Sequence, residues 1–313
     1  MRPAFLHSLL DLAEHDQRIN LVVGDLGFGL VEPFAQKYPD RFLNIGVAEQ
    51  NLITVSTGMA MCGKVVFAYS IANFPTLRCL EQIRNDICHH DASVVVVSVG
   101  CGLNYGALGV THHATEDLAI MRALPGMTAV APGDPVEAAL ATRALATQAR
   151  PAYLRLGKAG EPRVHPSDVL DFQLGKAIKV REGSDVTLIA SGTMLHNSVQ
   201  AAERLADQGI DARVLSMHTI KPLDTGAVHD AARETRAILT LEEHSVIGGL
   251  GSAVAETLAE FNEAKPPFKR LGIPSVFIRE VGNQDYLKNC YSLSVEGILR
   301  TVTAMLETEG VRQ

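Results

Sequence analysis

The chain's clearest strand signal is Ser93-Val94-Val95-Val96-Val97-Ser98-Val99, which stops at Gly100. A run of β-branched residues with no polar face predicts a strand that is buried on both sides, as strands are in parallel sheets. Before and after this run, apolar segments of strand length alternate with segments whose apolar residues recur at helical spacing. This alternation predicts an α/β fold, with helices covering both faces of a parallel sheet.

The alternation occurs in two series. In the first, we expect strands at 20–23, 65–68, 93–99, 128–131 and 152–156, and helices at 4–14, 48–61, 77–88, 115–123 and 135–148. In the second, we expect strands at 186–190, 212–216, 237–241 and 275–278, and helices at 194–208, 225–234, 252–261 and 294–306. A segment rich in Gly and Pro separates the two series. The sequence therefore predicts two doubly wound α/β domains, at 1–160 and 176–313, joined by a linker at 161–175.

The composition is not typical of a nucleic-acid-binding, membrane-spanning or secreted protein. The 313 residues carry 28 basic and 35 acidic side chains, a formal charge of −7, which gives no basic footprint for nucleic acid. No apolar run reaches the roughly 18 residues of a membrane span, and the first residues lack the features of a secretory signal. The five cysteines are odd in number and show no C-x-x-C spacing, so we expect neither a disulfide framework nor a zinc site, and a cytoplasmic location.

Ligands of open α/β sheets bind where parallel strands end, so the loops that follow strands are candidate sites. The first is Gly24-Asp25-Leu26-Gly27-Phe28-Gly29, whose glycines let a ligand approach the backbone. It lacks the G-x-G-x-x-G spacing of a dinucleotide site, and an ordinary strand-to-helix turn is the alternative.

The second candidate loop is Asn44-Ile45-Gly46-Val47-Ala48-Glu49-Gln50-Asn51, in which Glu49 opens a helix. A Glu in the first turn stabilises the helix dipole without any catalytic role. The residues around it are apolar, however, and a carboxyl shielded from water holds a proton more readily and can exchange it near neutral pH. Glu49 is therefore a candidate acid–base group.

The third candidate loop, at 100–113, follows the valine-rich strand and ends in His112 and His113. Long loops inside compact domains are usually functional. Paired histidines at the mouth of a parallel strand favour a site role, whereas metal binding is not expected because no partner ligands are visible. A fourth loop, at 242–253, is Gly-rich and precedes a helix, where it either binds a phosphate or allows tight strand–helix packing.

In this order, these segments resemble the transketolase family of thiamine-diphosphate enzymes over essentially the whole chain. The motifs that carry the resemblance are Arg2-Pro3-Ala4-Phe5, Gly24-Asp25-Leu26, Gly46-Val47-Ala48-Glu49-Gln50-Asn51, Phe74 with Glu81-Gln82-Ile83-Arg84, Thr111-His112-His113, Ile220-Lys221-Pro222-Leu223-Asp224 and Glu242-Glu243-His244-Ser245-Val246-Ile247-Gly248-Gly249-Leu250-Gly251. The resemblance implies a pyrimidine-binding domain followed by the family's C-terminal domain.

The resemblance also implies roles for individual residues. The catalytic residues would be Glu49, which hydrogen-bonds the aminopyrimidine ring and helps to form the reactive ylid, and His112, which faces the substrate. The cofactor-binding residues would be Asp25, Leu26, Val47, Glu49 and Phe74, with Phe74 stacked on the pyrimidine ring. The substrate-binding residues would be His112, His113, Arg155 and Arg2, with the two arginines at positions that hold sugar phosphate. The reaction would move a two-carbon glycolaldehyde unit from a ketose to an aldehyde.

The family's diphosphate-binding G-D-G motif does not occur in the 313 residues. The resemblance therefore implies one subunit of a split transketolase, whose partner subunit supplies the diphosphate and Mg²⁺ site. Because the family's cofactor lies between protomers, we expect an α2β2 heterotetramer with two-fold symmetry.

Two positions depart from the family pattern. Leu108-Gly109 stands where an Asp-Gly is usual, and Gly100 stands where a phosphate-binding His is common. We therefore expect non-standard sugar substrates. The alternatives are the β subunit of a 2-oxo acid dehydrogenase E1 component, deoxyxylulose-phosphate synthase, which is usually one chain, and a non-catalytic scaffold subunit. The presence of both Glu49 and His112 argues against the last of these.

Overall fold

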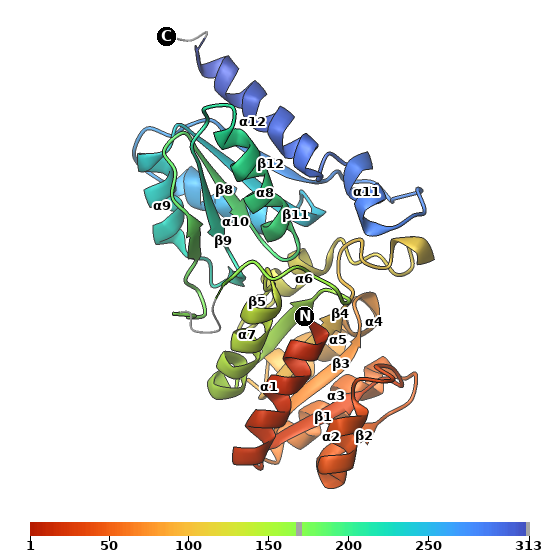
Figure 1. The fold of residues 1–313 in the computed structure, drawn as a ribbon. Helices are drawn as coiled ribbons and strands as arrows, with labels where there is room; N and C mark the ends of the chain where they lie inside the picture. The colour runs from red at the N-terminus through yellow and green to blue at the C-terminus, as the bar shows by residue number, and fades with distance from the viewer. Residues whose placement is uncertain (167–170, 311–313) are drawn as a thin grey trace.

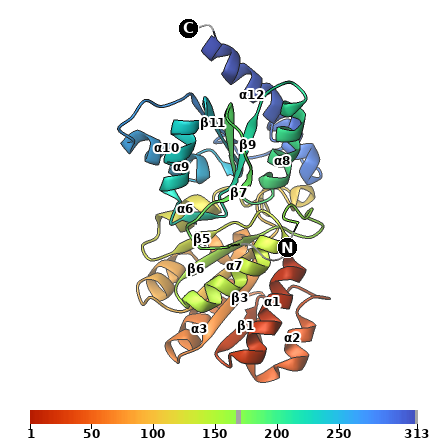
Figure 2. The same ribbon diagram turned by 60° about the vertical axis from the view of Figure 1, so that its left-hand side comes forward.

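The computed structural model describes residues 1–166 and 171–310, and it contains a seven-stranded sheet and a five-stranded sheet (Figures 1 and 2). The first sheet contains β1 (Ile19–Val23), β2 (Phe42–Asn44), β3 (Val65–Ile71), β4 (Val94–Val99), β5 (Thr128–Val130), β6 (Ala152–Leu156) and β10 (Thr219–Lys221). The second contains β7 (Ile178–Arg181), β8 (Val186–Ala190), β9 (Ala212–Ser216), β11 (Ala237–Ser245) and β12 (Phe268–Ile273). Their orders are β10-β5-β6-β4-β3-β1-β2 and β12-β11-β8-β9-β7.

Helices cover both sheets. The helices of the first half are α1 (Arg2–His15), α2 (Glu32–Lys37), α3 (Glu49–Met61), α4 (Asn73–Thr76), α5 (Leu80–Gln82), α6 (Asp117–Ala123) and α7 (Pro135–Gln148), with the 3-10 helices η1 (Pro39–Arg41) and η3 (Gly106–Leu108) and the π-helix η2 (Ile83–Cys88). The second half contains α8 (Met194–Ala206), α9 (Thr225–Glu234), α10 (Leu250–Glu260), α11 (Gln284–Cys290) and α12 (Val295–Gly310). The predicted α/β class, with two doubly wound domains, is confirmed.

Strand β4 shows why the valine-rich run decides the fold. Val94 and Val96 point into one apolar core together with Leu52 of α3, while Val95 and Val97 point into another core that α1 and α7 cover. Figure 2 shows α1 and α7 side by side on one face of the sheet, with α3 away from them. Side chains that alternate between two dry cores have to be apolar at every position, which is the pattern of the run.

The two halves of the chain share a β-sheet and an apolar core. Strand β10 comes from the second half but pairs antiparallel with β5 at the edge of the first sheet. The core beneath Val96 also includes Ile189, Met217 and Ile220 of the second half. The packing of the two predicted domains is therefore continuous and apolar. The predicted linker at 161–175 includes positions 167–170, which lie outside the described residues.

The predicted strand at 275–278 is wrong. Those residues form no strand, and Val276 and Phe277 are 53% and 78% exposed. The strand is β12, which pairs with β11 at the edge of the second sheet. Edge strands tolerate exposed charged residues such as Lys269 and Arg270, and these residues hide the apolar pattern that would have revealed the strand.

Two further details differ from the sequence-based expectation. The helix predicted at 77–88 is divided into the short α5 and the π-helix η2. The strands β7 and β10 are antiparallel to their neighbours, so neither sheet is purely parallel. Both strands are short, at four and three residues, and such lengths carry little periodic signal.

A buried ion pair in the first half lies next to the third candidate loop, and its arginine also bonds to the second half. On β6, the Arg155 Nε lies 2.7 Å from the Asp117 Oδ2 at the start of α6, and both side chains are at least nine-tenths buried. The Arg155 Nη2 also donates to the carbonyl oxygens of Ala114 and Glu243, at 2.8 and 3.1 Å. Burial opposes the ionisation of Asp117, but the charge and hydrogen bonds of Arg155, together with His244 and the Tyr153 hydroxyl, outweigh it and hold the pKa of Asp117 below its usual value.

We expect Asp117→Asn to lower the free energy of unfolding by about 3–5 kcal/mol at pH 7, because it leaves the Arg155 charge buried without a counter-charge. Since the pKa of Asp117 is lowered on folding, the pair stabilises the protein above the unfolded pKa of about 3.9, and this contribution is lost as the pH falls further. Denaturant unfolding measures the change.

The matched control is Arg150→Ala, which breaks an exposed ion pair with Asp91. Exposed pairs contribute about 1 kcal/mol or less, so this variant should unfold near the wild-type midpoint. Equal shifts in the two variants would contradict the anchoring role of the buried pair.

Candidate functional site

Most of the predicted site residues gather where the parallel strands of the first sheet end. Asp25 follows β1, Glu49 follows β2, Phe74 follows β3 and His112 lies in the loop after β4. Strands β2 and β3 lie on opposite sides of β1, so the chain changes its winding direction at this point. Such switch points are where α/β sheets bind ligands.

Glu49 is the first residue of α3, and its side chain is only 1% exposed. Its Oε1 accepts a hydrogen bond from the Ser70 hydroxyl at 3.3 Å, and its Oε2 lies 2.6 Å from Nη1 of Arg78. The carboxyl is therefore buried as expected, but its surroundings are not purely apolar. Arg78, which is half exposed, supplies an opposite charge that the sequence did not predict.

Arg78 links this carboxyl group to the aromatic ring of Phe74, which in turn contacts His112. The Arg78 guanidinium is 4.8 Å from the centroid of the Phe74 ring, and the Phe74 and His112 rings meet edge to face at 5.3 Å. The His112 Nδ1 lies 3.0 Å from the Thr111 hydroxyl. Glu49, Phe74 and His112 thus form one cluster connected through Arg78, although they come from α3, α4 and the loop after β4.

The remaining cofactor-binding candidates, Asp25, Leu26 and Val47, lie in the loops that follow β1 and β2. Asp25 adopts a left-handed conformation with φ 56°, and it exchanges hydrogen bonds of 3.1 and 2.9 Å with the Asn44 amide. Asn44 also accepts from the Gly46 N–H, so this pair ties the loop after β1 to the loop after β2. Leu26 is half-buried against the core, whereas Val47 is 75% exposed.

The two neighbouring histidines have different surroundings. His113 is buried, and neither of its ring nitrogens has a hydrogen-bond partner in the protein. Burial lowers the pKa of His113, which favours its neutral form. His112 is half-buried, and its ring contacts the rings of Phe74 and Tyr105. Only His112 belongs to the ring cluster, and substrate contact by His113 stays a prediction.

The position of Tyr105 explains why a glycine, Gly100, follows β4. Gly100 has φ 72°, and a Cβ on it would overlap the Tyr105 ring. The Tyr105 ring therefore fills the space over the strand end, and its centroid lies 6.2 Å from that of His112. A His at position 100 is incompatible with this arrangement.

The positive charges of the site differ from those that the sequence suggested. Arg155 is buried in its ion pair and does not reach an open surface, so its predicted phosphate contact has no support in this geometry. Lys158 has its Nζ 5.0 Å from the centroid of the Tyr105 ring, and Arg2 donates to the Lys158 carbonyl oxygen. Burial raises the pKa of Tyr105, and the Arg2 charge opposes this rise. Arg2 and Lys158 thus form a cationic pair beside Tyr105.

Sequence reasoning missed Arg78, Tyr105 and Lys158. Lys158 follows β6 directly after Gly157, so its place at a strand end was a usable signal. Arg78 and Tyr105 lie in irregular segments, where no periodicity indicates which way a side chain points. Their roles depend on contacts that only the fold creates.

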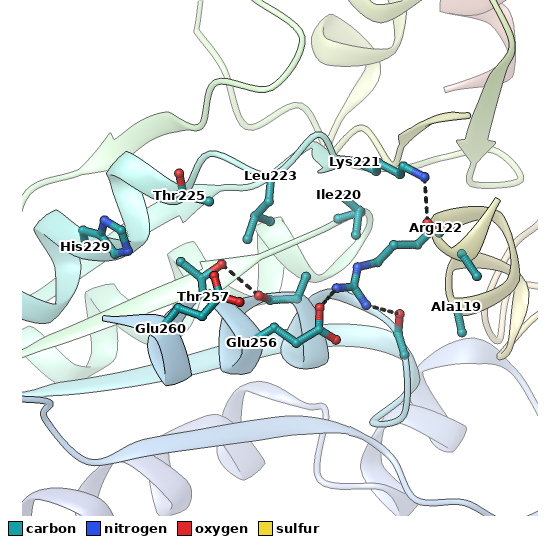
Figure 3. Close-up of a pocket in the computed structure, with 13 residues that line it drawn as sticks. Ala119, Arg122, Ile220, Lys221, Leu223, Thr225, His229, Glu256, Thr257 and Glu260 are labelled. Atoms are coloured by element: carbon teal, nitrogen blue, oxygen red, sulfur yellow. Dashed lines mark hydrogen bonds and ion pairs between the residues drawn. The ribbon is translucent and has the colours of Figure 1, made fainter. Parts of the chain in front are cut away.

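A cavity of about 830 Å³ opens elsewhere between the two halves, among α6, β10, α9 and α10 (Figure 3). Its lining contains none of the predicted site residues. Arg122 in it pairs with Glu256, and the Lys221 Nζ donates to the carbonyl oxygens of Arg122 and Leu124. Because both cations are engaged, this cavity offers no evident site for an anionic ligand.

The described part of the chain shows neither a group of metal ligands nor a helix that could cross a membrane. Residues 1–166 and 171–310 contain no group of three or more His, Cys, Asp or Glu side chains that could hold a metal ion. Within the same ranges, no helix is both long and apolar enough to pass through a bilayer. The thiols of the five cysteines are free.

Comparison with family models and known proteins assigns the chain to a family. Residues 1–161 match the transketolase pyrimidine-binding domain, and residues 175–298 match the transketolase C-terminal domain. The chain is 40% identical to one of the apulose-4-phosphate transketolase subunits of Phocaeicola vulgatus, over 96% of this chain and 95% of that protein. It is 38% identical to the 6-deoxy-6-sulfo-D-fructose transketolase subunit SqwH of a Clostridium species, over 100% and 96% of the two chains.

A solved structure agrees with this assignment. A split gene transketolase, described as an inactive beta4 tetramer, superposes with a TM-score of 0.90 at 37% identity and covers 98% of each chain. The matches extend over both halves of the chain and include subunits of split enzymes. The chain belongs to the transketolase family, and it consists of the pyrimidine-binding domain followed by the C-terminal domain.

Proposed function

We propose that this chain is one subunit of a two-component, thiamine-diphosphate-dependent transketolase that moves a two-carbon ketol unit from a ketose to an aldehyde. The observation that carries the proposal is the cluster of Glu49, Phe74 and His112. A buried carboxyl, an aromatic face and an imidazole meet at the edge of the sheet where α/β folds bind ligands.

The residues present fit the aminopyrimidine half of the cofactor. The Glu49 carboxyl is buried and offers hydrogen-bonding oxygens, while the half-buried Phe74 ring offers a stacking face. Asp25, Leu26 and Val47 lie in the adjoining loops. The 313 residues lack the family's G-D-G motif, and in this proposal the Mg²⁺ and diphosphate sites belong to the partner subunit.

Thiamine diphosphate, when bound, supplies the electron sink that carbon–carbon bond cleavage requires. Glu49 would hold a proton at its carboxyl and exchange it with the aminopyrimidine. His112 would donate a hydrogen bond or a proton to a substrate oxygen, since it is only half-buried. Burial of the Glu49 side chain would exclude water from the proton transfer.

The cationic pair suggests the substrate class. Arg2 and Lys158 stand beside Tyr105, where they can bind an anionic group of a sugar. The relatives named above are named for sugars that carry phosphate or sulfonate. With Gly100 and Leu108 in place of the family's His and Asp, these observations support a specialised anionic sugar, either as the ketose donor or as the aldehyde acceptor.

Exposed apolar side chains near the candidate site are evidence for an interface with a partner subunit. Phe28, Val47 and Leu108 are 77%, 75% and 56% exposed, in the loops that follow β1, β2 and β4. Apolar residues that gather around a binding edge often mark a protein interface. A partner with the diphosphate-binding domain would cover them, giving an α2β2 assembly in which the cofactor lies between subunits. The transketolase relatives favour this reaction over the 2-oxo acid dehydrogenase and scaffold alternatives.

Glu49→Gln should abolish ketol transfer by the reconstituted pair while leaving the fold intact. An amide cannot exchange the proton, and the loss of a general acid–base group typically costs about 10²–10⁴ in rate. Steady-state kinetics measures activity, and circular dichroism reports the fold. The control is Glu81→Gln, on the exposed surface of α5. Full activity in the Glu49 variant would refute the catalytic assignment.

Lys158→Ala should weaken the binding of phosphorylated or sulfonated ketoses and leave uncharged ketoses unaffected. A charge-assisted hydrogen bond contributes about 1.5–3 kcal/mol, so KM should rise by about ten-fold to a hundred-fold. Kinetics with D-fructose 6-phosphate, 6-deoxy-6-sulfo-D-fructose and D-fructose would separate the effects. Lys37→Ala on α2 removes a surface lysine far along the chain and serves as control. Equal KM changes for charged and uncharged ketoses would contradict the proposal.

A further inference from the structure

The loop that carries His112 is closed at its base by a short bridge. The backbone N–H groups of Gly102 and Ala114 each donate to the other residue's carbonyl oxygen, at 3.0 and 3.1 Å. Between these residues the loop runs between α4 of the first half and α11 of the second, drawn in yellow in Figure 1. The position of His112 therefore depends on what holds this base.

Glu243 of β11 reaches from the second half into that base. Its Oε1 accepts from the Leu103 backbone N–H at 2.5 Å. Its Oε2 accepts from the Thr193 hydroxyl at 2.8 Å, and the Lys288 Nζ lies 3.3 Å away. The Gln284 amide donates to both carboxylate oxygens, at 3.0 and 2.8 Å. The side chain is 1% exposed, so water does not compete for these bonds.

The backbone of Glu243 is linked through Arg155 to Ala114, on the other side of the bridge. Its carbonyl oxygen accepts from Arg155 Nη2, the same nitrogen that donates to the Ala114 carbonyl oxygen. Both sides of the Gly102–Ala114 bridge are thus attached to one residue of the second half. Because three donors other than Leu103 already orient the carboxylate, Glu243 presents a fixed acceptor to the loop.

The sequence of the loop is adapted to this contact. Gly102 has φ 63°, and a Cβ on it would lie 2.6 Å from the Glu243 Oε1 and 2.8 Å from its Cγ. Further along the loop, a Cβ on Gly106 would collide with Leu287 and would lie 2.5 Å from the Gly282 carbonyl oxygen. Glycines at 102 and 106 thus let the loop approach the second half closely.

We propose that Glu243 is a positioning residue for His112: by fixing Leu103 it holds the 102–114 loop so that the imidazole stands beside Phe74. The catalytic part of this inference rests on the proposed function. The attachment of the loop to Glu243 through Leu103, here called the clamp, does not. The C-terminal domain thereby contributes to the active site without contacting substrate.

The competing explanation is that Glu243 only neutralises the buried Lys288. The two explanations differ in what happens to the loop. If Glu243 only neutralises Lys288, its loss should destabilise the second half as a whole. If Glu243 holds the loop, its loss should free the 103–113 segment alone. Backbone hydrogen exchange resolves the two, because it reports opening segment by segment.

Hydrogen exchange on the full chain is the first test. Glu243→Ala should speed exchange in peptides from 103–113 by about ten-fold or more, while peptides from α1 and α7 stay at the wild-type rate. Gly102→Ala should do the same with Glu243 intact, which covers the case that the first variant does not fold. Thr193→Val removes one bond to the same carboxylate but leaves Leu103 in place, so its loop should exchange like the wild type.

Kinetics of the reconstituted pair is the second test. Glu243→Ala and Gly102→Ala should lower kcat by about ten-fold to a hundred-fold with smaller changes in KM, the effect expected of a misplaced catalytic group. Thr193→Val should retain kcat. Glu243→Gln should recover most of the rate, since its amide oxygen can still accept from Leu103.

Unchanged exchange at 103–113 in the two loop-freeing variants, or a uniform rise throughout the chain, would overturn the clamp. A freed loop with unchanged kcat would overturn the positioning role. A wild-type pair without ketol transfer would refute the proposed function instead, and hydrogen exchange would still decide whether Glu243 clamps the loop.

Discussion

Arg155 makes one buried cluster with Asp117, the Ala114 carbonyl oxygen and the Glu243 carbonyl oxygen, and the geometry of the candidate site depends on it. A guanidinium without water has to find all its partners within the protein, which limits the arrangements of the elements that supply them. Here those elements are β6, α6, the end of the His112 loop and β11. Arg155, held in its ion pair with Asp117, therefore connects the two halves of the chain through its hydrogen bond to the Glu243 carbonyl oxygen.

The cluster also explains how two α/β halves can build one site. The strands of the first sheet bring Glu49 and Phe74 together, since parallel strands end at a common edge. His112 stands in a longer loop whose base is held by the second half through Arg155 and Glu243. Arg78 contacts both Glu49 and Phe74, the two groups that an aminopyrimidine would need. In the proposed manner of cofactor binding, the Arg78 guanidinium would compete with the aminopyrimidine for the Glu49 Oε2.

The sequence predicted those parts of the structure that follow from local patterns. The valines of β4 predicted a strand buried on both faces, and the spacing around α7, β6 and β8 predicted their bounds to the residue. It did not predict β12, whose charged residues suit an edge strand. Nor did it show that Arg155 points inward to Asp117, since residue type at a strand end does not reveal its partner. Tyr105 over Gly100 could be found only once the loop was folded.

The central claim is that this chain holds half of a cofactor site and a partner subunit holds the other half. Calorimetric titration of thiamine diphosphate with Mg²⁺ tests it most directly, using the chain alone and the chain mixed with its partner. Saturable, tight binding in the mixture together with weak binding to the chain alone is the predicted result. Equally tight binding by the chain alone would contradict the account, because a chain that holds half of the cofactor site should gain affinity from the subunit that holds the other half.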